Sequence, residues 1–213
     1  MIELFGADYS VYVRSVRLAL EEKGLDYTMS PIDVFAPEGV SEDYLSLNPF
    51  GKIPTFRHGD FVLFETDAIL RYLDEAFDGP RLQPSVPRDR AVMNQILSIL
   101  DAYAYRTCVW EIYVERVEKT RGGAAADEVR IASALGEARK IVGTLETLIA
   151  SEPFMLGSDI CLADCHAAPM LHLLEQAEEG AMLLKRAPKL ARWLEMMRAR
   201  QSFQKTAPAP HTK

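Results

Sequence analysis

Cysteine, positive charge and long apolar runs are all scarce in this sequence of 213 residues. Its three cysteines, Cys108, Cys161 and Cys165, are an odd number, which speaks against a disulfide framework and favours a reducing compartment. Lysine and arginine total 24 against 31 acidic side chains, so the formal net charge is −7. Because nucleic-acid binding depends on clustered cations, this balance argues against a nucleic-acid partner.

The apolar runs are too short for a membrane helix, which needs about 20 residues. Residues 1–6 place an acid early and lack the basic region that opens a signal peptide. We therefore expect no membrane partner and a cytoplasmic location.

A metal site has little support in the sequence. Cys161, Cys165 and His166 lie close together, but on a helix the two cysteines share a face from which the histidine points away. No second ligand cluster is present to complete a tetrahedral site. We therefore expect no metal and assign these side chains to packing.

The first third of the chain alternates between strand and helix patterns. Residues 2–5 predict a strand, and apolar residues recur with helical spacing from Val13 to Leu20, before Gly24. Residues 26–34 predict a second strand, which a right-handed crossover pairs in parallel with the first. A short helix is expected over residues 41–47.

Two further strands and a helix follow. Residues 55–57 and 61–64 predict a hairpin, and apolar residues between 69 and 77 trace a helix. Residues 79–87 contain three prolines and a glycine and predict a linker.

The remainder of the chain follows helical spacing throughout. We predict a long helix over residues 88–119 and a second that starts after Asp127, a good N-cap. Residues 162–178 and 188–200 predict two more helices, the last with proline in its first turn.

Four motifs, in this order, resemble those of the glutathione transferase family. They lie at residues 10–17, 48–54, 64–73 and 159–164. The resemblance covers nearly the whole chain and is closest to the serine-type, phi-like group, whose sixth helix carries a proline where Pro169 stands. It implies an α/β plus all-α fold, in which a thioredoxin-like N-terminal domain precedes an all-helical C-terminal domain.

The same resemblance sets domain boundaries and a function. Residues 1–79 are expected to form the glutathione-binding domain, 80–87 the linker, 88–206 the helical domain with the electrophile pocket, and 207–213 a disordered tail. The implied enzyme activates the glutathione thiol for attack on small, hydrophobic electrophiles, with glutathione as co-substrate and no further cofactor. Two alternatives stay open: a non-catalytic ligand-binding protein, and a glutathione-dependent isomerase or dehalogenase.

Two glutathione-binding segments follow from the resemblance. Ile53-Pro54 is implied to be cis, with the Ile53 backbone pairing with the extended peptide, whereas the sequence alone favours a trans proline that opens an edge strand. Thr66 is expected to cap a helix and donate its hydroxyl to the γ-glutamyl carboxylate, while Glu65 faces the ammonium. The alternative for this pair is a plain helix cap.

The glycyl end of glutathione is where this sequence departs from phi-like relatives. Their cationic side chains before the second helix are replaced here by residues such as Gly39 and Val40. Lys52 is the nearby cation that remains, and we expect it to take the glycyl carboxylate.

Ser10 is the predicted catalytic residue. Lowering a thiol pKa from about 8.5 by about two units requires about 2.7 kcal/mol. One hydrogen bond to a charged group supplies about 1.5–3 kcal/mol and a helix N-terminus about 0.3–1 kcal/mol, so a hydroxyl at a helix start is sufficient. The alternatives are that Ser10 only caps the helix, or that Tyr9 or Tyr12 activates the thiol.

An electrophile pocket and a dimer contact complete the predicted sites. We expect Tyr12, Phe35 and Tyr105 to line the pocket; by α-helical spacing, Tyr105 and Trp110 fall on different faces of their helix. Phe50 resembles the aromatic key that inserts into the neighbouring subunit of related dimers, which implies a homodimer.

Overall fold

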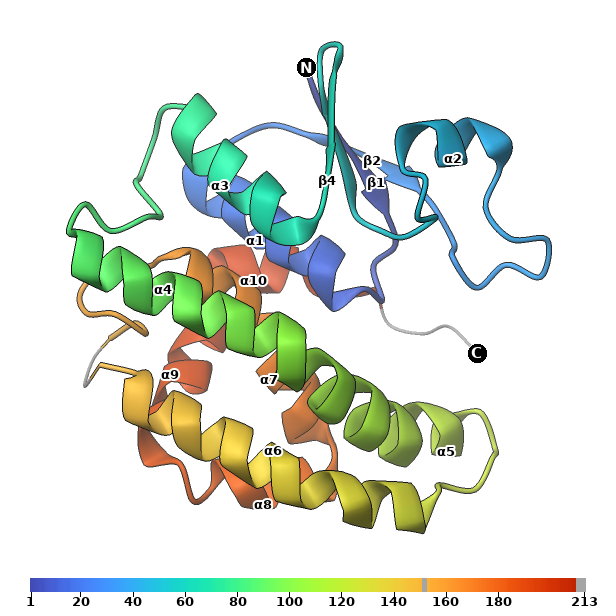
Figure 1. The fold of residues 1–213 in the computed structure, drawn as a ribbon, viewed down its shortest axis with the longest axis vertical. Helices are drawn as coiled ribbons and strands as arrows, with labels where there is room; N and C mark the ends of the chain where they lie inside the picture. Colours follow the sequence, from blue (N-terminus) through green and yellow to red (C-terminus); the bar gives the residue numbers. More distant parts are fainter. Residues whose placement is uncertain (151–152, 210–213) are drawn as a thin grey trace. The chain divides into compact units, whose positions relative to one another are not determined.

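The computed structural model describes residues 1–150 and 153–209 (Figure 1). The chain forms two compact units: residues 1–82 together with the segment that starts at Arg200, and residues 83–199. Within the residues described, no helix is long and apolar enough to cross a membrane.

A four-stranded sheet in the order β2-β1-β3-β4 is the base of the first unit. Strands β1 (Ile2–Gly6) and β2 (Thr28–Pro31) run parallel, as the crossover rule predicts. Strands β3 (Thr55–His58) and β4 (Phe61–Phe64) form the predicted antiparallel hairpin, and β3 also pairs with β1.

Three helices surround this sheet. Helix α1 (Val11–Lys23) ends at Gly24, whose φ of 66° lies in the left-handed region that glycine adopts without strain. Helix α3 (Thr66–Ala76) packs beside α1, whereas the short α2 (Glu42–Leu47) stands apart from both in Figure 1. Apolar side chains from the sheet, α1 and α3 form a fully buried core: Leu4, Val13, Val16, Leu20, Phe56, Ile69, Leu70 and Leu73.

The C-terminal segment belongs to the first unit. Helix α10 (Gln201–Lys205) packs on α1, although the sequence prediction assigned residues 88–206 to the helical domain. Polar contacts explain the placement, because Arg200 pairs with Glu22 and Arg17 donates to backbone carbonyls of the segment. Local periodicity carries no information about such distant pairings.

Part of the predicted disordered tail, 207–213, lies within the described residues. There the backbone N–H of Ala207 donates to the carbonyl of Gln204 at 3.2 Å. Residues 210–213 lie outside the described residues.

The second unit is helical throughout its described residues, apart from its loops. Its elements are α4 (Pro87–Ile99), η1 (Leu100–Glu118), α5 (Lys119–Arg121), α6 (Glu128–Leu148), α7 (Leu162–Gln176), α8 (Glu178–Leu184) and α9 (Pro188–Ala199). Asp127 caps α6 as predicted, since its carboxylate accepts from the N–H of Arg130 at 2.9 Å.

The predicted helix over residues 88–119 is one continuous helical ribbon in Figure 1, but its middle is wound differently. Segment η1 is a π-helix, in which each backbone N–H bonds to the carbonyl five residues earlier. The wider turn brings Tyr105 and Trp110 together, with ring centroids 6.5 Å apart and ring planes at 88°. The prediction that these two rings lie on different faces is therefore wrong, because it assumed α-helical spacing.

Helix α8 is an element that sequence reasoning missed. The helix predicted over residues 162–178 ends at Gln176, and a second short helix follows it. In the structure a Cβ added to Gly180 would lie 1.9 Å from the Leu174 carbonyl oxygen, so glycine permits the two helices to approach closely.

A buried carboxylate organises the start of α7. Asp164 accepts hydrogen bonds from the N–H of Cys161 at 2.8 Å, the N–H of Met155 at 2.9 Å and the indole of Trp193 at 2.7 Å. The Cys161 thiol accepts from the backbone N–H of Asp164 in return, so both halves of a capping box are present. Burial raises the pKa of the Asp164 carboxyl and that of the Cys161 thiol.

Candidate functional site

The loop before β3 contains a fixed turn. Ile53-Pro54 is cis, as the family resemblance implies. The carbonyl of Lys52 accepts hydrogen bonds from the Tyr44 hydroxyl at 2.6 Å and from the Asn48 side-chain amide at 2.9 Å. Because Tyr44 and Asn48 are both buried, these bonds hold the backbone of the loop in place. Sequence reasoning missed the role of Tyr44, whose single signal was an aromatic residue in a short helix.

Ile53 lies in this loop, two residues before the start of β3. Within residues 1–150 and 153–209, neither the backbone N–H nor the backbone C=O of Ile53 has a hydrogen-bond partner. Unpaired backbone groups beside a sheet are what an extended peptide needs for pairing.

The start of α3 is open to an anion. Glu65 occupies the N-cap position with φ 70° and makes no side-chain cap bond, so its carboxylate does not occupy the N–H groups at the helix start, where anions bind. Among the described residues, Glu65 is the single non-glycine residue with positive φ, a conformation typical of functional sites.

Thr66 is the first residue of α3, and its predicted role as the cap is therefore wrong. The cap position falls one residue earlier because Glu65 already has non-helical backbone angles. Thr66 is 6% exposed, and in the part of the chain that the structure describes its hydroxyl has no hydrogen-bond partner. It retains a donor for a ligand at the helix start.

Ser10 is the N-cap of α1. Its Oγ accepts a hydrogen bond from the N–H of Val13 at 3.3 Å, which confirms the capping interpretation. Capping uses a lone pair of the hydroxyl oxygen and leaves the hydroxyl hydrogen available to a ligand. The cap and a donor role at the positive end of α1 are therefore compatible.

The Tyr9 hydroxyl is occupied by the loop that follows β2. It donates to the Asp33 carboxylate at 2.9 Å and accepts from the N–H of Val34 at 3.2 Å. The Tyr9 ring packs against Phe35, with centroids 5.4 Å apart. These contacts favour Ser10 over Tyr9 as the donor to a thiol.

Lys52 is exposed, and its ammonium makes no ion pair with any residue that the structure describes. A cavity of about 380 Å³ is lined by the loop before α2, including Asp33, Glu38 and Val40. Val40 lies against the loop before β3, since a Cβ on Gly51 would stand 3.3 Å from its Cγ2. The lining of this cavity contains no lysine or arginine.

Comparisons with known proteins show the family to which this chain is similar. The family model for the glutathione S-transferase N-terminal domain matches residues 4–81, and that for the C-terminal domain matches residues 123–195. Glutathione S-transferase F14 of Arabidopsis thaliana is 32% identical over 192 residues, which cover 88% of this chain and 75% of the relative. This chain belongs to the glutathione S-transferase family.

A second group of relatives carries a different name. A stringent starvation protein A homolog from Pasteurella multocida is 30% identical over 83% of this chain and 76% of its own length. Among solved structures, apo glutathione S-transferase III has a TM-score of 0.86 at 30% identity and covers 100% of this chain and 99% of that one. Glutathione S-transferase-I bound with lactoylglutathione has a TM-score of 0.83 at 26% identity, over 97% and 98% of the two chains. These similarities confirm the predicted fold of the glutathione S-transferase family.

The predicted electrophile residues of this family member fall in different units. Tyr12, half-buried on α1, and Phe35, exposed in the loop after β2, belong to the first unit. Tyr105 belongs to the second unit, where it is half-buried beside Trp110 and burial raises the pKa of its hydroxyl. Their grouping in one pocket stays a prediction.

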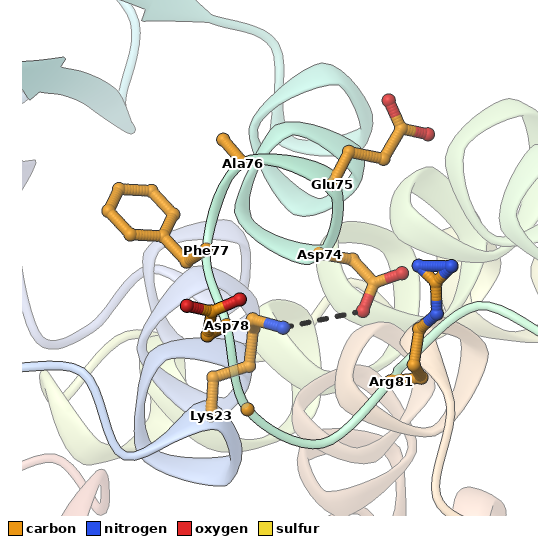
Figure 2. Close-up of a pocket in the computed structure, with 8 residues that line it drawn as sticks. Lys23, Asp74, Glu75, Ala76, Phe77, Asp78 and Arg81 are labelled. Atoms are coloured by element: carbon orange, nitrogen blue, oxygen red, sulfur yellow. Dashed lines mark ion pairs between the residues drawn. The ribbon is translucent and has the colours of Figure 1, made fainter.

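A second cavity, of about 320 Å³, lies in the glutathione S-transferase N-terminal unit. Figure 2 shows the residues that line it. It lies where α1 and α3 end, and the side chains of Lys23 and Asp74 point toward each other in it. None of the residues predicted for the glutathione site lines this cavity. Its contacts are structural, because Lys23 also donates to the Pro80 carbonyl at 3.1 Å and so holds the start of the linker against α1.

Proposed function

We propose that this chain is a glutathione transferase that activates the glutathione thiol at Ser10 for attack on small, hydrophobic electrophiles. The observation that carries the proposal is the hydrogen bonding of Ser10: its oxygen caps α1, and its hydroxyl hydrogen stays available to a ligand. A hydroxyl donor and a helix N-terminus together stabilise a thiolate by about 2–4 kcal/mol, enough to lower a thiol pKa by about two units.

Glutathione binding is proposed to use the first unit alone. The free backbone groups of Ile53 pair with the cysteinyl residue, and the open start of α3 with the Thr66 hydroxyl receives the γ-glutamyl carboxylate. Glu65 faces the ammonium of the ligand, and Lys52, which has an unpaired ammonium among the described residues, takes the glycyl carboxylate.

The acceptor side of the reaction is proposed from aromatic residues. Tyr12, Phe35 and Tyr105 offer apolar ring surface that suits hydrophobic electrophiles, and attack by the thiolate on such compounds is a detoxification reaction. No further cofactor enters this chemistry, because the thiolate itself is the nucleophile.

A non-catalytic binding protein is the second candidate function. Two observations favour it: relatives named stringent starvation protein A homolog match as well as several transferases do, and the cavity beside Val40 has no cationic lining. In this case the chain binds a ligand or a partner through the same fold without turnover.

Retention on immobilised glutathione, followed by assay against a panel of electrophiles, separates the two candidates. The transferase proposal expects retention, elution by free glutathione and conjugation of at least one electrophile that is lost in Ser10→Ala. Retention without turnover across the panel favours the binding protein, and absence of retention contradicts both glutathione-based proposals.

We further propose a homodimer. Phe50 is 66% exposed and rests edge-on against Phe64, with centroids 5.8 Å apart, so its outer face is available to a second copy. Light scattering is expected to give twice the mass of one chain, with dissociation shifted to higher concentration in Phe50→Ala. Phe61→Ala, which removes another exposed phenylalanine, is the control and is expected to leave the dimer unchanged.

A further inference from the structure

Arg14 is a buried cation without an acidic partner. Its residue is 3% exposed, and no carboxylate of residues 1–150 or 153–209 forms an ion pair with it. Within the part of the chain that the structure describes, its Nε has no hydrogen-bond partner. Burying a charge is costly unless it is paired, so a guanidinium that stays unpaired in this position calls for a function.

The contacts of Arg14 fix the guanidinium without neutralising it. Nη2 donates to the carbonyl of Phe203 at 3.0 Å, and the guanidinium carbon lies 3.9 Å from the centroid of the Phe203 ring. Burial, with the charge of Arg17 as the smaller cause, lowers the pKa of Arg14 to about 10. The group therefore stays charged at neutral pH.

Phe203 is in turn held on α1 by the rest of the C-terminal segment. Arg200 forms two hydrogen bonds with the Glu22 carboxylate, at 2.7 and 2.5 Å, and Ser202 bonds to the same carboxylate. The C-terminal segment and α1, which are far apart in the sequence, thus together hold the Arg14 side chain in place.

Helix geometry relates Arg14 to Ser10. The N–H of Arg14 donates to the Ser10 carbonyl at 3.0 Å, which places the two residues one helical turn apart. Residues four apart share a helix face, and side chains on a helix lean toward its N-terminus. The charge of Arg14 therefore adds to the positive end of the α1 dipole, where Ser10 stands.

We propose that Arg14, seated by Phe203, is a positioning residue whose charge stabilises the thiolate that forms beside Ser10. This inference rests on the proposed function and adds a residue to it. A purely structural Arg14 holds the C-terminal segment through its hydrogen bond and ring contact, and its charge has no effect on the thiol.

The pKa of enzyme-bound glutathione, measured from thiolate absorbance as pH is varied, tests the charge directly. Arg14→Met removes the charge and keeps the length of the side chain, and it is expected to raise the thiol pKa by about one unit, a tenfold smaller ionisation constant. Arg14→Lys restores the charge and is expected to recover at least half of this shift. Arg57→Met is the control, since it removes one positive charge from the same unit at a sheet residue paired with Glu3.

A second pair of variants tests the charge without changing Arg14, in case Arg14→Met does not fold. Phe203→Glu places a carboxylate where the ring now lies and neutralises the guanidinium, whereas Phe203→Gln has nearly the same shape and no charge. We expect the thiol pKa in Phe203→Glu to exceed that in Phe203→Gln by about one unit.

The outcomes separate this inference from the proposed function. The inference is overturned if the thiol pKa is the same in Arg14→Met, in Arg14→Lys and in the unchanged protein. It is also overturned if the thiol pKa is the same in the two Phe203 variants. Either result leaves Ser10 as the donor to the thiol. A protein that binds no glutathione before any substitution overturns the proposed function and this inference with it.

Discussion

Lys23 Nζ and Asp74 Oδ1 lie 3.5 Å apart, and both side chains are 1% exposed. The pair joins the last residue of α1 to α3, and Asp74 also accepts a hydrogen bond from the N–H of Leu82 at 2.6 Å. Each charge is thus buried against the other and against the chain that leaves the first unit. Removing one partner leaves the other charge buried without its counterion, and this change lowers the free energy of unfolding more than replacing both partners does.

Asp74→Asn is accordingly expected to lower the free energy of unfolding by about 3 kcal/mol, and the double variant Lys23→Met with Asp74→Leu by less. Urea denaturation of the three proteins measures both effects. Glu137→Gln breaks the exposed pair with Lys140 and is expected to cost less than about 0.5 kcal/mol. If Asp74→Asn lowers the free energy of unfolding no more than Glu137→Gln does, the buried-pair interpretation is contradicted.

Ser10→Ala is expected to lower kcat/KM for conjugation by about 10-fold to 150-fold, since a hydrogen bond to a thiolate contributes about 1.5–3 kcal/mol. Ser10→Thr keeps the hydroxyl and the cap and is expected to retain activity within about threefold. Ser10→Asp keeps the cap and repels the thiolate, so we expect a folded and inactive protein. Steady-state kinetics with thermal melts check all three, and full activity in Ser10→Asp rejects the role of the hydroxyl.

Local signals were enough for the elements that depend on local chemistry. Ser10 and Asp127 are caps because their side chains reach the backbone three residues on, and Gly24 ends α1 because glycine adopts positive φ freely. The cis peptide at Pro54 came from the family resemblance, since the sequence alone favoured a trans proline.

Features set by distant contacts escaped sequence reasoning. The seat of Arg14 depends on Phe203, 189 residues away, and no periodicity links the two. Gly180 permits α8 because of its approach to a neighbouring helix, not because of its own neighbours in sequence. Thr66 was placed at the cap because a hydroxyl is the usual residue there, whereas the structure uses the strained Glu65.

Acid is expected to weaken the second unit through Glu115. This buried carboxylate bonds to Lys119 at 2.7 Å and Arg130 at 2.8 Å, and its pKa is lowered, chiefly by the bond to Lys119. A lowered folded-state pKa contributes stability that is present above the unfolded value, about 4.5, and is lost as pH falls through the folded value. Glu115→Gln is therefore expected to be less stable at pH 7, with a gap to the unchanged protein that narrows below about pH 4.5.

Denaturation midpoints between pH 3 and pH 7 measure this gap. Glu137→Gln serves again as the control, because its partner Lys140 is exposed. A gap that stays constant across this range contradicts the role of Glu115.

Cys161→Ser is expected to leave activity unchanged and to raise the free energy of unfolding by a few tenths to about 1 kcal/mol, because serine is a better N-cap than cysteine. The Cys161 thiol meets the N–H of Asp164, a contact that a hydroxyl makes more strongly. Thermal melting checks the direction, and a lower melting temperature in Cys161→Ser contradicts the prediction. Cys165→Ser, in the core of the same helix but away from its cap, is the control and is expected to destabilise.

Tyr44→Phe is expected to raise KM for glutathione by about 3-fold to 10-fold with little change in kcat. The substitution removes the hydrogen bonds of the Tyr44 hydroxyl with the Lys52 carbonyl and the Thr55 hydroxyl, and a typical hydrogen bond contributes about 1 kcal/mol. The loss loosens the backbone on which Ile53 pairs with the ligand, and it leaves Ser10 untouched. Tyr27→Phe makes the same chemical change in the same unit, at a hydroxyl that bonds to Arg17, and it is expected to leave KM unchanged. If both variants bind glutathione as the unchanged protein does, the loop before β3 does not depend on the Tyr44 hydroxyl, and the Asn48 amide alone fixes it.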